Sequence, residues 1–366
     1  MLRRFLKNET VLLISAFAAA VSMFFIPPSP DYFGYIDWAV IALLFCLMTA
    51  VQGIKSIGFF DRAAAFFISG AKTSRRLAAI LAGLCFFFSM LITNDVALIT
   101  FVPLTIILFG ENPRNLIVVI VLDTIAANLG SMLTPLGNPQ NLFIYSYFHF
   151  QPADFIAAML PYSAVSLVLL ALSLVFIKDE PLRKRNIDTA EKSLDIPSYI
   201  SSCLMLLLSL LTVLHVLNYI VCLSSVLVLM LIFDRGLFKK IDYMLLLTFI
   251  CFFIFVGNIA RIEPVKAFLE SVVATNEAEA GILLSQIISN VPCAVMLSGF
   301  TKNARELLVG VNIGGLGTLV ASLASLISFK FYAKAEKADR KSFLIVFTLF
   351  NVAFLFALYL LYRLIF

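Results

Sequence analysis

Long apolar runs separated by short polar stretches make up most of the chain, and one run has a polar break at its centre. Residues 77–92 and 96–109 are almost entirely apolar, and Thr93, Asn94 and Asp95 stand between them. Each flank is shorter than the ~20 residues that a transmembrane helix needs. A carboxylate at membrane depth costs roughly 2.5–3.5 kcal/mol on insertion scales. The pattern therefore predicts a re-entrant hairpin near residues 77–109, whose tip lines a cavity.

A second interrupted run, near residues 281–300, breaks at Ser289, Asn290, Val291 and Pro292. Residues 58–70 place Asp61 and Arg62 among aromatic side chains, which suits a helix at the membrane interface. Residues 116–133 lead into TPLGNPQN, which cannot continue a helix. Further crossing segments are expected at residues 11–26, 38–54, 155–177, 199–214, 219–233, 243–256 and 343–366. Residues 307–329 contain the glycine-rich NIGGLGT, and this segment and residues 116–133 are expected to be two broken helices.

Composition agrees with this pattern. Of the 366 residues, 61% are hydrophobic and only 13% are charged, and the mean hydropathy is +1.01. A soluble domain could not cover so much apolar surface, so we expect an all-α polytopic membrane protein. The net charge of +5 comes from basic residues in loops, which indicates topology and no nucleic-acid partner. The six cysteines show no CxxC spacing, so no metal or redox role is expected for them.

The loops also predict orientation. Basic residues cluster near the N-terminus, around residues 62–76, in the charged stretch 178–197, at residues 235–240 and at residues 330–341. The positive-inside rule places these segments in the cytoplasm, with the N-terminus inside and the C-terminus outside. This multi-pass arrangement in the cytoplasmic membrane requires both interrupted runs to be re-entrant. Arg261, Lys266, Lys302 and Arg305 then fall outside, against the rule.

The chain divides into two similar halves, residues 1–177 and 198–366, joined by a cytoplasmic linker at 178–197. Each half has a helix opening with Asp37 or Asp242 and a hairpin broken at Asn94 or Asn290. Each then has a glycine-containing span, and we align residues 128–131 (NLGS) with residues 315–318 (GLGT). The loop charges give the halves opposite orientations. Inverted repeats with paired broken helices are typical of secondary transporters.

Several polar residues within the apolar runs can be interpreted as structural or as functional. Asn94, Asp95 and Asn290 suit helix N-caps, and a cap at membrane depth aims the positive helix end into the cavity. Asp123, inside a span, is either a buried carboxyl bonded to the hairpin or a cation ligand or proton carrier. His149 and His215 stand at span ends and are expected to be interfacial.

Four motifs carry a family resemblance: TNDVALITFVPL, ANLGSMLTPLGNPQNL, ISNVP and VNIGGLGTLVASL. They resemble the ion transporter superfamily, which includes divalent-anion:sodium symporters, citrate carriers, arsenite permeases and some sodium/proton antiporters. The resemblance implies an elevator-type carrier with one cation site per repeat and substrate between the tips. It implies cation ligands at Thr93, Asn94, Gly137 and Asn138 and at Ser289, Asn290 and Thr318. Asp123 is a further candidate because carboxylates inside a membrane span are mostly functional. The implied substrate contacts are Asn94, Asp95, Pro135, Asn138, Asn290, Val291 and Thr318.

The chain departs from the family pattern at the hairpin tips. Dicarboxylate carriers read Ser-Asn-Thr at each tip, whereas Asp95 and Val291 occupy the third position here. The first half also lacks one helix of the usual repeat. We expect a secondary transporter of a small anion, an organic carboxylate or an inorganic oxyanion, coupled to sodium or protons and without other cofactors. The alternative is a sodium/proton antiporter using Asp95 and Asp123.

Other function classes are less well supported by the sequence. A channel or structural membrane protein would not need paired broken helices. No nucleophile–base pair, HExxH motif or phosphate-binding loop indicates an enzyme. The expected partners are the lipid bilayer and a small substrate, with a homodimer as an open option.

Overall fold

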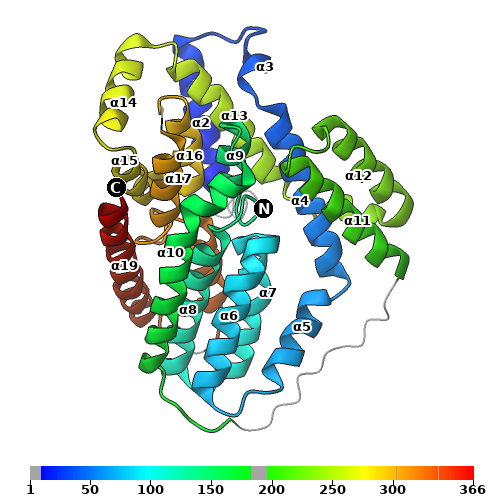
Figure 1. Ribbon diagram of the computed structural model, residues 1–366, viewed down its shortest axis with the longest axis vertical. Helices are drawn as coiled ribbons and strands as arrows, with labels where there is room; N and C mark the ends of the chain where they lie inside the picture. Colours follow the sequence, from blue (N-terminus) through cyan, green and yellow to red (C-terminus); the bar gives the residue numbers. More distant parts are fainter. Residues whose placement is uncertain (1–9, 183–195, 302, 337) are drawn as a thin grey trace.

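A computed structural model describes residues 10–182, 196–301, 303–336 and 338–366. Within these ranges the chain is helical, without named strands, and a single isolated bridge joins Thr73 to Pro181. Most helices run roughly along the long axis of the molecule (Figure 1). The all-α fold class expected from the sequence is confirmed.

The first half contains nine α-helices and a short 3-10 helix among its described residues. They are α2 (Thr10–Phe25), α3 (Tyr32–Tyr35), α4 (Trp38–Ser56), α5 (Phe59–Ile68), α6 (Ser74–Ile92), α7 (Asn94–Phe109), α8 (Pro113–Ser131), α9 (Pro139–Tyr147), α10 (Pro152–Ser173) and η1 (Leu174–Phe176).

The described part of the second half has the same number of α-helices and another short 3-10 helix. They are α11 (Ile196–Val213), α12 (Tyr219–Phe233), η2 (Arg235–Lys239), α13 (Tyr243–Ile259), α14 (Glu263–Thr275), α15 (Glu277–Ile288), α16 (Asn290–Ser298), α17 (Ala304–Ile313), α18 (Leu323–Tyr332) and α19 (Arg340–Ile365).

Among the described residues, six helices are long and apolar enough to cross a membrane. A seventh span results if α13 and α14, which bend by 103° at their junction, are counted as one. These helices confirm a polytopic membrane protein. The glycine-rich run at 307–329 is broken into α17 and α18, because residues 314–322 leave the helical path, as expected for the second broken helix.

The order of elements from α4 to α10 recurs from α13 to α19. In each series a long helix and a shorter one precede a helical hairpin, a helix broken in two and a closing helix. Figure 1 shows α6 and α7 in the lower half of the molecule and α15 and α16 in the upper half. The helices before each series differ, because α11 and α12 precede α13 whereas α2 and the short α3 precede α4. Most of the predicted linker, residues 183–195, lies outside the described residues, so the boundary between the halves stays a prediction.

Helix α8 lies at the centre of the core, and every residue from Asn115 to Ser131 is buried. It packs against both arms of the first hairpin and against α10, α18 and α19. A separate small cluster joins α4 to α11 and α12 through Cys46, Met205, Cys222 and Met230. The helix pair α11–α12 is therefore attached to α4. The hairpins pack on the broken helices, because α7 contacts α8 and α18, and α16 contacts α9 and α17.

Candidate functional site

The two hairpin tips have the same unusual backbone geometry. Thr93 joins α6 to α7 with φ 73° and ψ 144°, and Ser289 joins α15 to α16 with φ 75° and ψ 153°. Both lie close to a region of backbone space that is populated essentially by glycine, and each such residue costs of order 1–3 kcal/mol. Such strain persists only where the surrounding structure over-determines it, and it clusters at functional sites.

Each tip is bonded to the break of the broken helix in its own half. The backbone N–H of Asn94 donates to the carbonyl oxygen of Gly137 at 3.0 Å, and that of Asn290 donates to Ala321 at 2.9 Å. The hydroxyls of Thr134 and Thr318 also occupy matching positions. Thr134 donates to the carbonyl oxygen of Met90 near the end of α6, and Thr318 donates to that of Gln286 near the end of α15.

These contacts correct the internal alignment expected from the sequence. If Gly137 corresponds to Ala321 and Thr134 to Thr318, then Asn128 corresponds to Asn312. Our alignment of residues 128–131 with 315–318 was therefore out of register by three positions. The two glycine-containing stretches look alike, and only the hydrogen bonds fix how they correspond.

The position of the helix cap also differs from the expectation. Thr93, rather than Asn94 or Asp95, is the N-cap of α7, and its hydroxyl oxygen accepts from the N–H of Val96 at 3.5 Å. Asn94 is already the first helical residue, and its Oδ1 accepts from the N–H of Asp95 at 2.9 Å. In the second hairpin Ser289 holds the corresponding position, without a side-chain cap bond. The side-chain N–H₂ of Asn94 is therefore directed to another partner.

That partner belongs to a buried polar network that joins the halves. Nδ2 of Asn94 donates to Oδ1 of Asn128 on α8 at 3.0 Å. The same oxygen accepts from the hydroxyl of Ser322, the N-cap residue of α18, at 3.1 Å. Nδ2 of Asn128 lies 3.5 Å from the hydroxyl of Ser325. The first tip is thus linked to the break in the second half.

A related set of hydrogen bonds links the start of α9 in the first half to α17 in the second half. Nδ2 of Asn138, the N-cap residue of α9, lies 3.3 Å from Oδ1 of Asn312 on α17. Nδ2 of Asn312 donates to Oδ1 of Asn141 at 2.6 Å. The sequence reasoning did not name Asn141, Asn312, Ser322 or Ser325 as site residues. The signal that would have found them is the correct register, which pairs Asn138 with Ser322 and Asn141 with Ser325.

Glycines allow the hairpins to lie directly on the broken helices. A Cβ at Gly130 would lie 2.0 Å from the carbonyl oxygen of Phe86. A Cβ at Gly314 would lie 2.8 Å from the hydroxyl of Ser285, and one at Gly315 would lie 2.8 Å from Nδ2 of Asn290. The close approach therefore depends on the absence of a side chain at each of these positions.

Four helices begin at this network: α7, α9, α16 and α18. Their first residues or N-caps are Asn94, Asn138, Asn290 and Ser322, all of which take part in the bonds described above. A helix N-terminus carries a partial positive charge. The site therefore combines a positive electrostatic field with backbone and amide oxygens.

A cavity of about 140 Å³ adjoins the first tip. Its lining comes from α4, α7, α9, α18, the start of α13 and the loop after α8, and its polar members are Gln52, Thr93, Asp95, Asn138 and Asp242. Neither lysine nor arginine is among the described residues that line it. The equivalent side chain at the second tip, Val291, is only 5% exposed, so the two tips differ in accessibility.

The structure brings together most of the predicted residues. Thr93, Asn94, Gly137 and Asn138 meet at the first tip, and Ser289 and Asn290 meet at the second. Pro135 is half-buried in the loop after α8. Thr318 is exposed, and both its N–H and its hydroxyl bond to Gln286.

Asp123 lies deeper in α8 and is fully buried. The hydroxyl of Thr105 donates to its Oδ2 at 2.7 Å, whereas Oδ1 has no hydrogen-bond partner among the described residues. No hydrogen bond between described residues joins Asp123 to the tips, so any role for this carboxyl in ion coupling is separate from the asparagine network.

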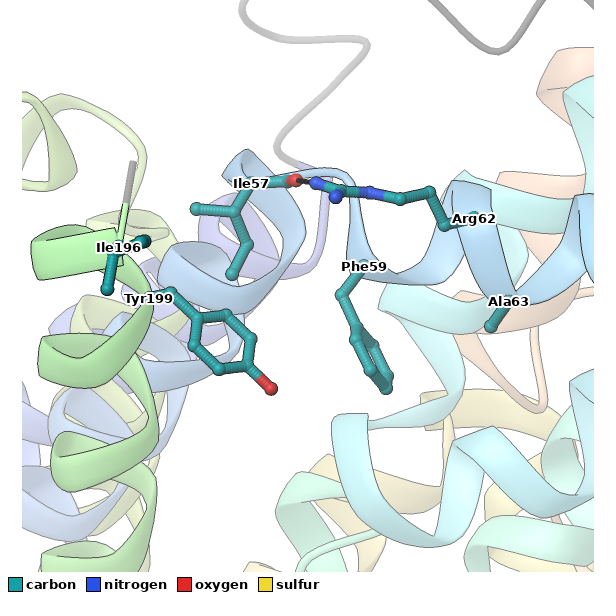
Figure 2. A pocket seen from close by; sticks show the side chains of 6 residues that line it. All are labelled: Ile57, Phe59, Arg62, Ala63, Ile196 and Tyr199. Carbon is teal, nitrogen blue, oxygen red and sulfur yellow. Dashed lines mark hydrogen bonds between the residues drawn. The ribbon is translucent and has the colours of Figure 1, made fainter. Parts of the chain in front are cut away.

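A larger cavity of about 480 Å³ lies between α4–α5 and α11. Figure 2 shows its lining of Ile57, Phe59, Ala63, Ile196 and Tyr199, with Arg62 donating to the carbonyl oxygen of Ile57. Its walls are mainly apolar and contain neither hairpin tip. The 140 Å³ cavity is therefore the better candidate for the functional site.

The sequence profile of the citrate transporter family matches residues 1–306. The chain belongs to the citrate transporter family. It is 36% identical over 303 residues to "Uncharacterized transporter MJ0456" of Methanocaldococcus jannaschii, covering 82% of each chain. It is 34% identical over 315 residues to "Inner membrane protein YbiR" of Escherichia coli, covering 84% of this chain and 83% of the relative. The resemblance to the ion transporter superfamily is confirmed.

A further relative shares a shorter segment. The human "P protein" is 32% identical over 119 residues, which cover 31% of this chain and 14% of that protein. Family membership and the transporter relatives establish a membrane transporter as the general function. The comparisons identify neither the substrate nor a coupling ion.

Proposed function

We propose that this member of the citrate transporter family carries a small anion, an organic carboxylate or an inorganic oxyanion, coupled to sodium or protons. The observation that carries the proposal is the convergence of four helix N-termini on one buried network. Helix N-termini attract anions through the positive end of the helix dipole. In secondary transporters with broken helices they point at anionic groups of the substrate.

The carboxylate of Asp95 opposes an anion in the same cavity, and cation coupling resolves this conflict. Carbonyl and amide oxygens at the helix breaks are suitable sodium ligands. We assign the first cation site to Thr93, Asn94, Gly137 and Asn138. We assign the second to Ser289 and Asn290, together with Thr318 after a small rearrangement. A cation or proton close to Asp95 would neutralise the carboxylate and permit the anion to bind.

The movement we propose is of the elevator type, in which the hairpins and broken helices shift relative to α4, α11 and α12. The one-sided cavity fits this scheme, because the first tip is accessible and Val291 at the second is buried. We place the protein in the cytoplasmic membrane with the N-terminus inside and the C-terminus outside. The first tip then faces the cytoplasm.

A second candidate, sodium/proton exchange, has a specific observation in its favour. Asp95 and Asp242 line the same small cavity, and neither lysine nor arginine is among its described lining residues. Two carboxylates of this kind can bind a cation or a proton in turn. In this alternative the protein transports no organic substrate, and Asp123 provides a further buried carboxyl.

Substitution of Asp95 distinguishes the two candidates. For an anion symporter, Asp95→Asn removes a charge that opposes the substrate, so anion binding to the purified protein should persist or tighten while its cation dependence falls. For an antiporter, the same change should abolish exchange, and neither protein should bind an anion. Asp61→Asn on α5 is the matched control, because this exposed carboxyl lies outside the cavity. Anion binding that keeps its full cation dependence in Asp95→Asn would contradict the role assigned to Asp95.

A further inference from the structure

The two histidines of the chain lie next to each other in the structure. His149 stands in the turn after α9, and His215 stands in the turn after α11. Their ring centroids are 6.4 Å apart, with the ring planes at 62°. From the sequence alone they are expected to be two separate interfacial residues. The fold instead joins a turn of the broken helix to a turn of the helix pair attached to α4.

Both histidines occupy a backbone position that normally belongs to glycine. Their φ angles are 52° and 60°. Each lies in a turn that ends a helix with a hydrogen bond between residues i and i+5. The N–H of Phe150 donates to the carbonyl oxygen of Tyr145, and the N–H of Val216 donates to that of Leu211. Glycine is the usual residue at this point of such a turn, because it has no Cβ. Histidine adopts this region more often than most residues that have a Cβ. The shared turn places both imidazoles at the C-terminal ends of their helices.

The surroundings favour a bound cation. The C-termini of α9 and α11 end at this pair, and a helix C-terminus carries a partial negative charge. The ring of Tyr145 stacks on that of His215, with the ring centroids 5.4 Å apart and the ring planes at 6°. The hydroxyl of Tyr145 is buried and has no hydrogen-bond partner among the described residues. Both histidines are exposed, so water can reach the remaining coordination positions.

We propose that His149 and His215 bind one divalent transition-metal ion of the Zn²⁺ class, with water completing its coordination. Neutral imidazole is a preferred ligand of Zn²⁺, with Zn–N bonds of ~2.0–2.1 Å. The described residues contain no group of three or more candidate protein ligands, so this is a two-histidine site that binds reversibly. The ion would tie α9 to α11. If the elevator movement proposed above occurs, the bound ion inhibits transport.

Zn²⁺ binding to the full-length protein tests the proposal. The protein is purified through a tag without histidine, in a background without the six cysteines, and titrated with Zn²⁺ or Mg²⁺ by calorimetry. The unsubstituted histidine pair should bind one Zn²⁺ per chain and no Mg²⁺. His149→Gly and His215→Gly should each weaken Zn²⁺ binding at least tenfold. Glycine suits the positive φ at both positions, so these variants should fold at least as well as the parent without metal.

Persistent Zn²⁺ binding in the double glycine variant would overturn the site. A flux measurement separates this result from the proposed transport mechanism. Inhibition by Zn²⁺ that disappears in both glycine variants supports the metal site and its position across a moving interface. Binding that depends on both histidines without any inhibition supports the metal site and contradicts only the movement of α9 relative to α11.

Discussion

The side-chain amide of Asn94 donates a hydrogen bond to Oδ1 of Asn128, over a distance of 3.0 Å. The first residue lies at the hairpin tip, and the second lies near the end of α8, just before its break. Because Ser322 donates to the same oxygen, this bond also reaches the second half of the chain. The first hairpin tip and both helix breaks therefore form one polar unit.

Removing the central amide of this unit should affect both stability and ion coupling. Asn128→Ala leaves the buried groups of Asn94 and Ser322 without their acceptor, at a cost of about 1–3 kcal/mol. We expect a lower unfolding temperature in detergent and a large loss of cation-dependent transport. Asn112→Ala is the control, because Asn112 caps α8 far from the break and its loss costs about 1 kcal/mol. Equal transport defects in the two variants would argue against a special role for Asn128.

Two glycine substitutions should have opposite effects on stability. Gly130→Ala places a Cβ 2.0 Å from the carbonyl oxygen of Phe86, and overpacking of this kind costs typically ~1–3 kcal/mol. Gly83→Ala, in the neighbouring α6, meets no atom within 4 Å and should stabilise the helix by up to about 1 kcal/mol. Unfolding temperatures of the two purified variants test this difference. A stable Gly130→Ala protein would mean that the hairpin does not lie so close to α8.

The strained tip predicts that stability and function can be separated. Thr93→Ala loses the hydroxyl and keeps the positive φ, whereas Thr93→Gly loses the hydroxyl and relieves the strain. We expect the glycine variant to be more stable than the alanine variant by about 1–3 kcal/mol. Both should lose sodium dependence to the same extent, because the candidate ligand oxygen is absent from both. Normal sodium dependence in both variants would mean that Thr93 is only a helix cap.

The different exposure of the two tips predicts asymmetric labelling. Ile99 lines the cavity and is 38% exposed, whereas Val295, at the matching position of the second hairpin, is 2% exposed. In a cysteine-free background, Ile99→Cys should react with an impermeant thiol reagent from the cytoplasmic side and Val295→Cys should be protected. Imposing an ion gradient should shift this balance. Equal labelling of both from one side under every condition would indicate a channel rather than a carrier.

Much of the architecture could be predicted from the sequence, because apolar runs of fixed length and their polar breaks follow directly from the thickness of the bilayer. The breaks at Thr93–Asn94 and Ser289–Asn290 were located correctly to within one residue. The break between α17 and α18 is indicated only by the glycine-rich NIGGLGT, because residues 314–322 are mostly small and apolar and do not interrupt the hydropathy pattern.

The partners within the site were harder to predict. Asn312 and Ser325 bond to residues more than 150 positions away, and no local pattern contains that information. The contribution of Asp242 to the cavity depends on how α13 begins beside α7, which the sequence does not specify. The same reason explains why His149 and His215 were not recognised as neighbours.

Flux into proteoliposomes that contain the purified protein tests the proposed function most directly. Labelled citrate, succinate, phosphate and arsenite are offered separately, with an inward sodium gradient, an inward proton gradient or none. Our account predicts gradient-driven accumulation of at least one of these anions, and loss of that accumulation in Asn128→Ala. Sodium/proton exchange without uptake of any of these anions would contradict the account and favour the antiporter.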